Sequence, residues 1–190
     1  MNVSRITGKR IIVVGSPGAG KSTISRAVSS ATGLPLFHLD RLYWKPGWVP
    51  VRREKFLERV RAVIASPAWI IDGNYQSTFP ERFEAADTVI FLDFSRIACI
   101  VGALRRLVFD GRKERPDMTE GCEERFNRKF LEFLLFIWSY QSTGRKETVS
   151  ILNSEKSGGK TIYVLHNRKE ANSLMRSIAS RHPDVAGPDI

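Results

Sequence analysis

Residues 15–22 read Gly-Ser-Pro-Gly-Ala-Gly-Lys-Ser, which fits the pattern G-x-x-x-x-G-K-[S/T] at every fixed position. The run RIIVV precedes this octapeptide at residues 10–14, and an apolar stripe with helical spacing follows it at residues 24–31. A glycine-rich loop between a buried strand and a helix surrounds an anion with successive backbone N–H groups. The stretch therefore predicts a phosphate-binding loop at the edge of a sheet.

Each part of this loop has an expected contact. Lys21 is expected to reach the β- and γ-phosphates of a nucleoside triphosphate, and the Ser22 hydroxyl is expected to ligate Mg²⁺. ATP and Mg²⁺ are accordingly the predicted cofactors. The loop residues expected to hold the nucleotide are Gly15, Ser16, Pro17, Gly18, Ala19, Gly20, Lys21, Ser22 and Thr23.

The rest of the chain alternates short apolar runs with amphipathic stretches. Strands are expected at residues 10–14, 36–39, 69–71, 88–92 and 161–165. Helical stripes lie between and after them, at residues 24–31, 56–64, 97–108, 126–137 and 171–178. Strands that alternate with helices predict one α/β domain over residues 1–190, with a parallel sheet between two helical layers.

Carboxylates follow three of the expected strands, where ligands of such sheets bind. Asp40 and Asp72 are expected to face the pocket, where one holds a water on Mg²⁺ and the other accepts a proton from an acceptor hydroxyl. Asp72 is the predicted metal residue beside Ser22. A turn at Asp72, a helix cap at Asp40 and a helix cap at Asp93 are the structural alternatives.

Two segments interrupt the alternation. Residues 109–125 are dense in charge and contain three residues that break helices, Gly111, Pro116 and Gly121, which favours a lid over the site. Residues 142–160 are polar and are expected to be an ordinary surface connection. Candidate cations for a transferred phosphoryl group are Arg105, Arg106, Arg112 and Arg115.

Composition excludes several classes of protein. The chain has 190 residues, a net charge of +10 and only two cysteines, too few for a disulfide scaffold or a four-cysteine zinc site. No apolar run reaches the roughly 18 residues of a membrane span. We expect a cytoplasmic protein without a membrane partner, either a monomer or a homodimer. The basic excess is shared by both halves of the chain and suits phosphates or nucleic acid.

Several motifs together resemble the adenylate-kinase-like branch of the P-loop kinases. They are GSPGAGKS at 15–22, HLD at 38–40, YW at 43–44, PGW at 46–48, IDGNY at 71–75, LD at 92–93, and RPD with EGC at 115–122. More narrowly, they are similar to a bacterial group labelled adenylate kinase or "DNA topology modulation protein" (FlaR-like). The resemblance covers residues 10–170 and leaves the substrate poorly defined.

This resemblance implies a P-loop NTPase three-layer α/β/α sandwich, with sheet order 2-3-1-4-5 and an arginine-bearing lid. It implies transfer of the γ-phosphoryl group of ATP to a small acceptor, of the nucleotide or nucleoside type, with catalytic roles for Lys21, Asp40, Asp72 and lid arginines. It also implies that Arg168 lies near the adenine. The stretch after the second strand, HLDRLYW at 38–44, departs from the Thr-Gly-Asp-Met type of adenylate kinases, which leaves the acceptor open.

Alternatives remain at two levels. His38 is a second proton-transfer group or a structural histidine, and Tyr43, Trp44 and Trp48 stack on an acceptor or cover a hydrophobic loop. For the whole chain, the rivals to a kinase are a DNA-associated regulatory protein and a P-loop NTP hydrolase. Nucleic acid is the less favoured partner, because no recognised DNA-reading module is present.

Overall fold

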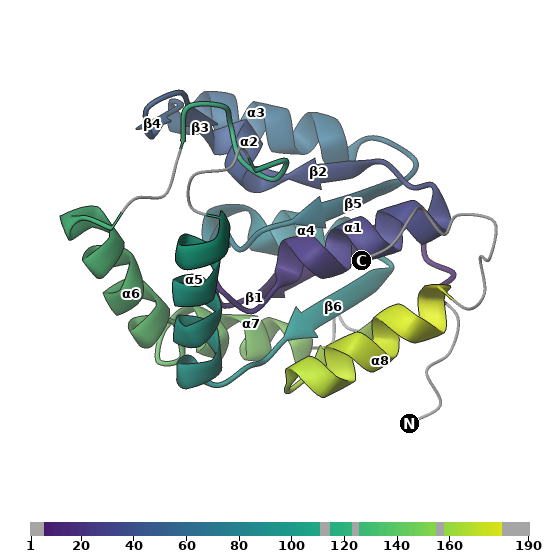
Figure 1. The fold of residues 1–190 in the computed structure, drawn as a ribbon. Coiled ribbons are helices and arrows are strands. Elements are labelled where there is room, and N and C mark those ends of the chain that lie inside the picture. The colour runs from purple at the N-terminus through teal and green to yellow at the C-terminus, as the bar shows by residue number, and fades with distance from the viewer. Residues whose placement is uncertain (1–5, 111–114, 123–125, 155–157, 180–190) are drawn as a thin grey trace.

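A five-stranded parallel sheet forms the centre of the computed structural model, which describes residues 6–110, 115–122, 126–154 and 158–179 (Figure 1). Counted along the chain, its strands take the predicted order 2-3-1-4-5, which with the two strands of the small hairpin included in the numbering is β2-β5-β1-β6-β7. Every neighbouring pair in this sheet is parallel. The strands are β1 (Arg10–Gly15), β2 (Leu36–His38), β5 (Trp69–Asp72), β6 (Thr88–Leu92) and β7 (Thr161–Leu165).

Alternate residues of the buried strands face two separate hydrophobic clusters. Ile11 and Val13 of β1 belong to one cluster, and Ile12 and Val14 belong to the other. Since both faces of a central strand are covered, the run RIIVV shows no alternation of polar and apolar residues. The predicted three-layer α/β/α architecture is confirmed.

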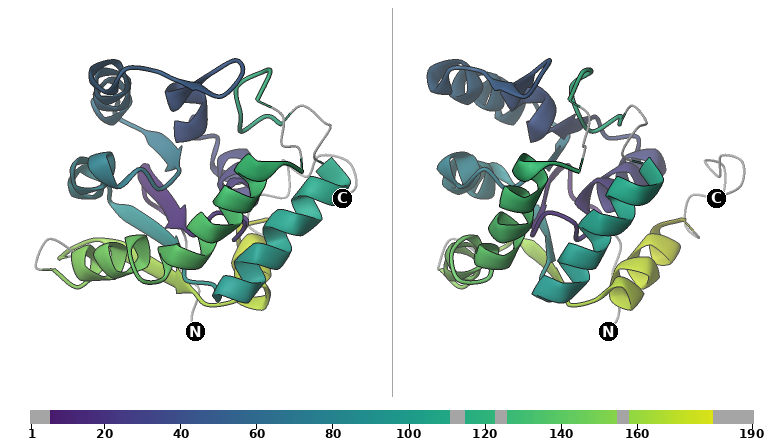
Figure 2. Two further views of the ribbon diagram at one scale, coloured as in Figure 1. Left: turned by 90° about the vertical axis from the view of Figure 1, so that its left-hand side faces the viewer. Right: turned by 60° about the vertical axis from the view of Figure 1, so that its left-hand side comes forward.

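Helices from different parts of the chain cover each face (Figures 1 and 2). Helices α1 (Lys21–Thr32), α5 (Arg96–Asp110) and α8 (Arg168–Ala179) contribute buried residues to the first cluster, together with Ile137 of α6 (Arg128–Tyr140). The second cluster takes residues from α3 (Arg53–Ile64), α4 (Phe79–Ala85) and α7 (Gly144–Leu152).

Small elements separate β2 from α3. Helix α2 (Leu39–Tyr43) follows β2 directly. The second strand was predicted to end at Leu39, but Leu39 is the first residue of this helix. The antiparallel pair β3 (Trp44–Lys45) and β4 (Val49–Pro50) then forms a short hairpin. After β5, the 3-10 turn η1 (Gln76–Thr78) leads into α4.

The prediction of an ordinary surface connection at residues 142–160 was wrong, because α7 occupies the middle of it. The residues of α7 that turn inward are Gly144, Thr148 and Leu152, one per turn. A Cβ atom at Gly144 would lie only 2.6 Å from the ring of Tyr140. Two of these three inward positions are occupied by a glycine and a threonine, so the sequence shows no continuous apolar stripe here.

The expected lid at 109–125 is described in part. Its first two residues extend α5, and residues 115–122 form turns. Residues 111–114 and 123–125, with Arg112 among them, lie outside the described part of the chain. No helix among the described residues is long and apolar enough to cross a membrane.

The register of the sheet brings the carboxyl ends of the strands to one edge. Asp72 of β5 pairs with both Val13 of β1 and His38 of β2, and Gly15 pairs with Leu92 of β6. The phosphate loop and the strand-end side chains therefore meet at this edge, as expected for an open parallel sheet.

Candidate active site

The phosphate loop connects β1 to α1 and packs directly against α5. A Cβ atom at Gly18 would lie 2.1 Å from the carbonyl oxygen of Cys99, and one at Gly102 would lie 2.1 Å from the carbonyl oxygen of Gly18. Glycine at both positions lets the two backbones touch. Gly20, which caps α1, leaves the first N–H groups of that helix open at the loop. The backbone thus has the form that binds phosphate.

A cleft of about 2290 Å³ opens over this loop. Of the residues predicted to hold the nucleotide, those that line the cleft are Pro17, Gly18, Gly20, Lys21, Ser22, Thr23 and Arg168. Gly15, Ser16 and Ala19 lie buried beneath it. The predicted loop residues therefore lie together, either as cleft lining or as the support under it.

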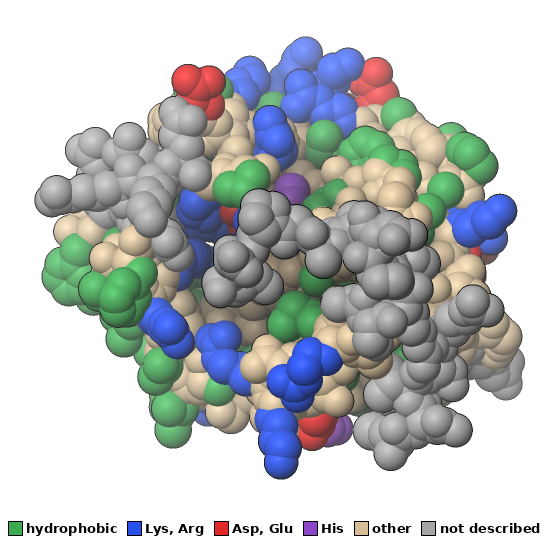
Figure 3. Space-filling model, turned by 45° about the vertical axis from the view of Figure 1, so that its right-hand side comes forward, with side chains coloured by type: hydrophobic (Ala, Val, Ile, Leu, Met, Phe, Trp, Pro, Cys, Tyr) green, Lys and Arg blue, Asp and Glu red, His purple; other side chains and the backbone are tan. Residues whose placement is uncertain are grey.

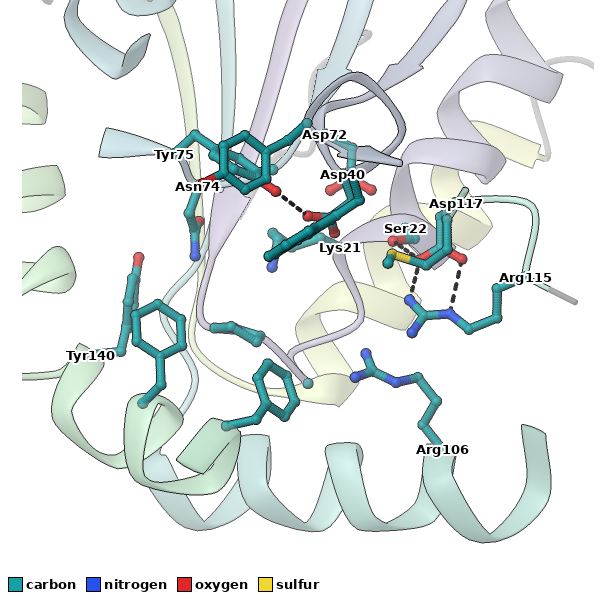
Figure 4. A pocket seen from close by; sticks show the side chains of 18 of the residues that line it. Lys21, Ser22, Asp40, Asp72, Asn74, Tyr75, Arg106, Arg115, Asp117 and Tyr140 are labelled. Atoms are coloured by element: carbon teal, nitrogen blue, oxygen red, sulfur yellow. Dashed lines mark hydrogen bonds and ion pairs between the residues drawn. The ribbon is translucent and has the colours of Figure 1, made fainter. Parts of the chain in front are cut away.

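Lys21 lies at the centre of the cleft's charges. Its Nζ donates to the carbonyl oxygen of Ser16 at 3.2 Å. Burial lowers the pKa of Lys21, Asp72 and Asp40 counteract this, and Arg106 adds to the lowering. The lysine, the two carboxylates and the arginine therefore interact electrostatically, and Figure 4 shows their side chains around one space.

Asp40 is held by a tyrosine from another segment. The hydroxyl of Tyr75 donates to Asp40 Oδ1 at 2.6 Å. Burial raises the pKa of Asp40, and the hydrogen bond from Tyr75 counteracts this rise. Asp40 lies in the first turn of α2, where His38 occupies the capping position, so the predicted alternative of a helix cap is wrong. Its carboxylate lines the cleft and has one oxygen bound by the tyrosine.

Asp72 closes β5 and is only 5% exposed. Its Oδ2 lies 2.8 Å from Nδ1 of His38, so the histidine orients this carboxylate. Its Oδ1 has no hydrogen-bond partner among the residues that the structure describes, although it is buried. A buried carboxylate oxygen of this kind at the wall of the cleft is suited to accept a hydrogen bond from a ligand or from a metal-bound water.

The turn after Asp72 depends on a buried arginine. Arg82, from α4, is fully buried and donates to the carbonyl oxygens of Gly73, Asn74 and Tyr75. Burial lowers the pKa of Arg82 to about 9, which leaves the guanidinium charged at neutral pH. Asn74, held in this turn, accepts a hydrogen bond from the backbone N–H of Gly15 at 3.0 Å. Arg82 thereby links the strand-end turn to the phosphate loop.

Residues 115–122 reach the phosphate loop from the other side. Ser22 Oγ donates to Asp117 Oδ2 at 2.9 Å, and Arg115 donates through Nε to Asp117 Oδ1 at 3.2 Å and through Nη2 to Oδ2. Burial would raise the pKa of Asp117, but the bonds from Arg115 and Ser22 hold it well below its ordinary value. Figure 4 shows this group beside the loop. Asp117 is a site residue to which the sequence analysis gave no role.

The predicted arginines differ in their positions. Arg106 projects from α5 toward the pocket in Figure 4, and Arg115 contacts Asp117. Arg105 lines the cleft but is exposed, with its guanidinium 5.8 Å from the ring centre of Phe109. Arg168 lies against α5, since a Cβ atom at Gly102 would be 2.7 Å from its Nη2. The remaining candidate, Arg112, lies outside the described residues.

An aromatic cluster lines the cleft next to Asp40. Tyr43 is at its centre, with its ring centre 4.8 Å from Trp44, 5.2 Å from Phe56 and 5.0 Å from Tyr75. Trp48 packs edge-on against Trp44 at 5.5 Å. These five side chains all line the cleft, and part of the cluster also packs on the second hydrophobic cluster. Both predicted roles, acceptor stacking and hydrophobic cover, fit this position.

Asp93 has a structural role that sequence reasoning missed. Arg145 of α7 donates to both of its oxygens, at 2.6 and 2.7 Å. The N–H of Ala98 donates to Ser95 Oγ at the start of α5, so Ser95 caps this helix. The predicted alternative of a helix cap at Asp93 is therefore wrong. Because Arg145 lies in the segment predicted as a plain connection, no local sequence signal pairs it with Asp93.

The donor set fits Mg²⁺ bound together with a nucleotide. No group of three or more His, Cys, Asp or Glu side chains that could hold a metal occurs in the described ranges. Mg²⁺ at such sites takes only one or two protein ligands, and phosphates and waters complete its shell. The pair of Ser22 and Asp117, with Lys21 beside it, meets that requirement.

Comparisons with protein-family models and with curated protein sequences give no match. Among solved structures, a gluconokinase from Sinorhizobium meliloti 1021 is similar over 96% of this chain and 97% of that chain, with a TM-score of 0.50 and 17% sequence identity. An unliganded sugar kinase from Janibacter sp. HTCC2649 aligns over 94% and 95% of the two chains, with a TM-score of 0.46 and 17% identity.

At this level of identity, the likeness shows the fold alone. The chain has the α/β fold of a P-loop kinase, with the five-stranded parallel sheet in the predicted order. The resemblance to P-loop kinases is therefore supported as a fold. The narrower FlaR-like group and the identity of the acceptor stay predictions.

Proposed function

We propose that this protein is an ATP-dependent kinase that transfers the γ-phosphoryl group to a hydroxyl of a small acceptor. The observation that carries the proposal is that one cleft contains both a phosphate loop and an oriented carboxylate. A complete phosphate loop with Lys21 lies on one side, and Asp40, held by Tyr75, lies on the other. The fold of a P-loop kinase supports the same reaction class.

In this proposal, the backbone N–H groups of the loop and the amine of Lys21 bind the triphosphate. Arg106 and Arg115 supply further positive charge, with Arg105 at the rim, because transfer of a phosphoryl group depends on positioning and charge neutralisation. Residues 115–122 are the described part of the proposed lid. Ser22 would hold Mg²⁺, which would neutralise charge on the phosphates, and Asp72 Oδ1, which has no hydrogen-bond partner among the described residues, would accept a hydrogen bond from a water on the ion.

Asp40 is the proposed general base. The acceptor oxygen attacks the γ-phosphorus, its bond to hydrogen breaks as Asp40 takes the proton, and the bond from the γ-phosphorus to the bridging oxygen breaks to release ADP. Tyr75 orients the carboxylate so that the oxygen not bound by the tyrosine is available to the hydroxyl. The aromatic cluster beside Asp40 is the proposed surface for the acceptor.

The test is ADP formation from Mg-ATP with a panel of nucleotides, nucleosides, sugars and small alcohols. With the right acceptor, we expect turnover that Asp40→Asn lowers by about 10² to 10⁴-fold while ATP affinity stays close to that of the wild type. Lys21→Ala should reduce turnover by about 10² to 10³-fold. Glu120→Gln, an exposed carboxylate change near the cleft, serves as the control.

Two results would contradict the proposal. ADP release at the same rate with and without every acceptor would favour a hydrolase. Tight, salt-sensitive binding to DNA without turnover would favour the regulatory alternative. On the face drawn in Figure 3, the Lys and Arg side chains that are visible lie in several separate groups.

A further inference from the structure

Ser22, the hydroxyl of the phosphate loop, has one carboxylate at hydrogen-bond distance. Its Oγ lies 2.9 Å from Asp117 Oδ2, and Asp117 is only 6% exposed. P-loop proteins place an acidic side chain near this hydroxyl to complete the metal site. The question is which carboxylate of this chain takes that position.

The carboxylates at the strand ends are engaged elsewhere. Asp93 is bound by both donors of Arg145, and Asp40 accepts from Tyr75. Asp72 is fixed by His38 through one oxygen. Among the described residues, Asp117 is the carboxylate for which a contact with Ser22 is observed, and it comes from a segment far away in the sequence.

The distance between the two oxygens matches the geometry of Mg²⁺. Two neighbouring ligands of an octahedral Mg²⁺, each about 2.0 to 2.1 Å from the ion, are about 2.9 Å apart. Ser22 Oγ and Asp117 Oδ2 already have this spacing. An ion between them would need the hydroxyl to turn its proton away and would not need the backbone of either segment to move.

We propose that Asp117 is the acidic protein ligand of the Mg²⁺ that accompanies the nucleotide, and that it binds the ion together with Ser22. The inference rests on the nucleotide-binding part of the proposed function. It does not depend on the identity of the acceptor.

The charges around Asp117 suit this role. Arg115 now balances the carboxylate through its Nε and Nη2 donors. A divalent cation at Asp117 would take over that balance, and the guanidinium would then be available to a phosphate oxygen in the same cleft. Binding of the metal at Asp117 would therefore be coupled to the placement of Arg115 on a phosphate.

The position of Asp117 is fixed by contacts with the acceptor side of the cleft. Thr119 Oγ1 donates to the carbonyl oxygen of Trp44 at 2.7 Å, and the N–H of Gly47 donates to the carbonyl oxygen of Gly121 at 3.1 Å. Cys122 Sγ lies 3.3 Å from the carbonyl oxygen of Lys45. The proposed metal ligand is therefore carried by a segment attached to the β3–β4 hairpin.

The experiment measures metal affinity without turnover. Mn²⁺, which has a paramagnetic signal, is titrated into the full chain saturated with an ATP analogue whose β–γ bond cannot be cleaved, and free Mn²⁺ is followed by electron paramagnetic resonance. We expect Asp117→Asn to weaken Mn²⁺ binding by about tenfold or more. Glu120→Gln, an exposed carboxylate three residues away, should leave it unchanged.

Asp117→Glu separates ligation from a purely structural role, because it keeps the carboxylate in a side chain one methylene longer. Retention of most of the Mn²⁺ affinity in Asp117→Glu, with its loss in Asp117→Asn, is the expected pattern. Equal losses in both variants, or unchanged or tighter Mn²⁺ binding in Asp117→Asn, would overturn the proposal.

Wild-type protein that binds no Mn²⁺–analogue complex would overturn both this inference and the proposed function. Normal Mn²⁺ binding without phosphorylation of any acceptor would count against the proposed function alone.

Discussion

The phosphate end of the cleft, at residues 15–22, consists of the backbone of one continuous stretch, whereas the proposed acceptor end, around Asp40, consists of side chains from several elements. At the phosphate end, the residues of the stretch 15–22 other than Pro17 contribute N–H groups whose positions follow from backbone angles. At the acceptor end, Asp40 depends on Tyr75, whose turn depends in turn on Arg82. The structure of the first end is thus set by its backbone angles and by close contact between backbones, and that of the second end by a series of hydrogen bonds.

This difference predicts that the two ends fail in different ways. A side-chain atom added at Gly15 or Gly18 of the phosphate end meets backbone that cannot move aside. A side chain removed from the acceptor end leaves polar groups without partners. Three substitutions test the comparison, and they are given from the largest expected effect to the smallest.

Gly18→Ala should have the largest effect. Gly18 has φ +80°, and the added methyl carbon would lie 2.1 Å from the carbonyl oxygen of Cys99. Backbone strain and overpacking together should reduce the free energy of unfolding by about 4 kcal/mol. The loop would also lose its contact with α5, so we expect no measurable binding of an ATP analogue. Urea denaturation and calorimetric titration check the two effects.

Gly33→Ala is the matched control. Gly33 ends α1 with φ +70°, and a methyl carbon there would meet nothing within 4 Å. Strain alone should cost about 1 to 2 kcal/mol, and nucleotide affinity should stay unchanged. Equal losses of stability in the two variants would show that close approach contributes nothing at Gly18.

Arg82→Ala should have the next largest effect. The substitution removes the donors to the carbonyl oxygens of Gly73, Asn74 and Tyr75. The carbonyl oxygen of Tyr75 keeps two other donors, but those of Gly73 and Asn74 lose the arginine, which should reduce the free energy of unfolding by about 3 kcal/mol. Arg61→Ala, which removes an exposed arginine that also pairs with α4, should change stability little. Similar denaturation midpoints for both variants would contradict the supporting role of Arg82.

The phosphate end could be predicted from the sequence because its information is local. The octapeptide at 15–22 contains the loop, and the buried strand and helix around it set the fold class. The strand order followed from the resemblance to P-loop kinases, and the sheet has that order. Asp40 and Asp72 were predicted because strand ends meet at one edge of a parallel sheet.

The partners of these residues could not be predicted in the same way. Asp117 lies 95 positions from Ser22, and Arg145 lies 52 positions from Asp93. Such contacts are set by three-dimensional packing and leave no periodic pattern in the sequence. The signals that existed were weak. Asn74 and Tyr75 follow Asp72 in the stretch IDGNY, and Asp117 stands in the stretch RPD, but neither stretch states which group it contacts.

Tyr75→Phe should have the smallest effect on the fold and a specific effect on pH dependence. Burial raises the pKa of Asp40, and the hydrogen bond from Tyr75 counteracts that rise. Removing the hydroxyl should raise the pKa of Asp40 further. The proposed base must be ionised, so the acid limb of kcat/KM for the acceptor should move to higher pH in the variant. Steady-state rates measured across the acid range test this.

Tyr140→Phe is the control, because it removes the hydroxyl of a buried tyrosine in the same cleft without touching Asp40. The acid limb should keep its wild-type position in that variant.

The raised pKa of Asp40 also affects the pH dependence of stability. An acid whose pKa is raised by folding stabilises the native state when protonated, and this contribution is lost as pH rises through the raised pKa. Tyr75→Phe should therefore extend this stabilising contribution to higher pH. In the kinetic experiment, an acid limb of kcat/KM that does not move in Tyr75→Phe would show that a group other than Asp40 takes the proton.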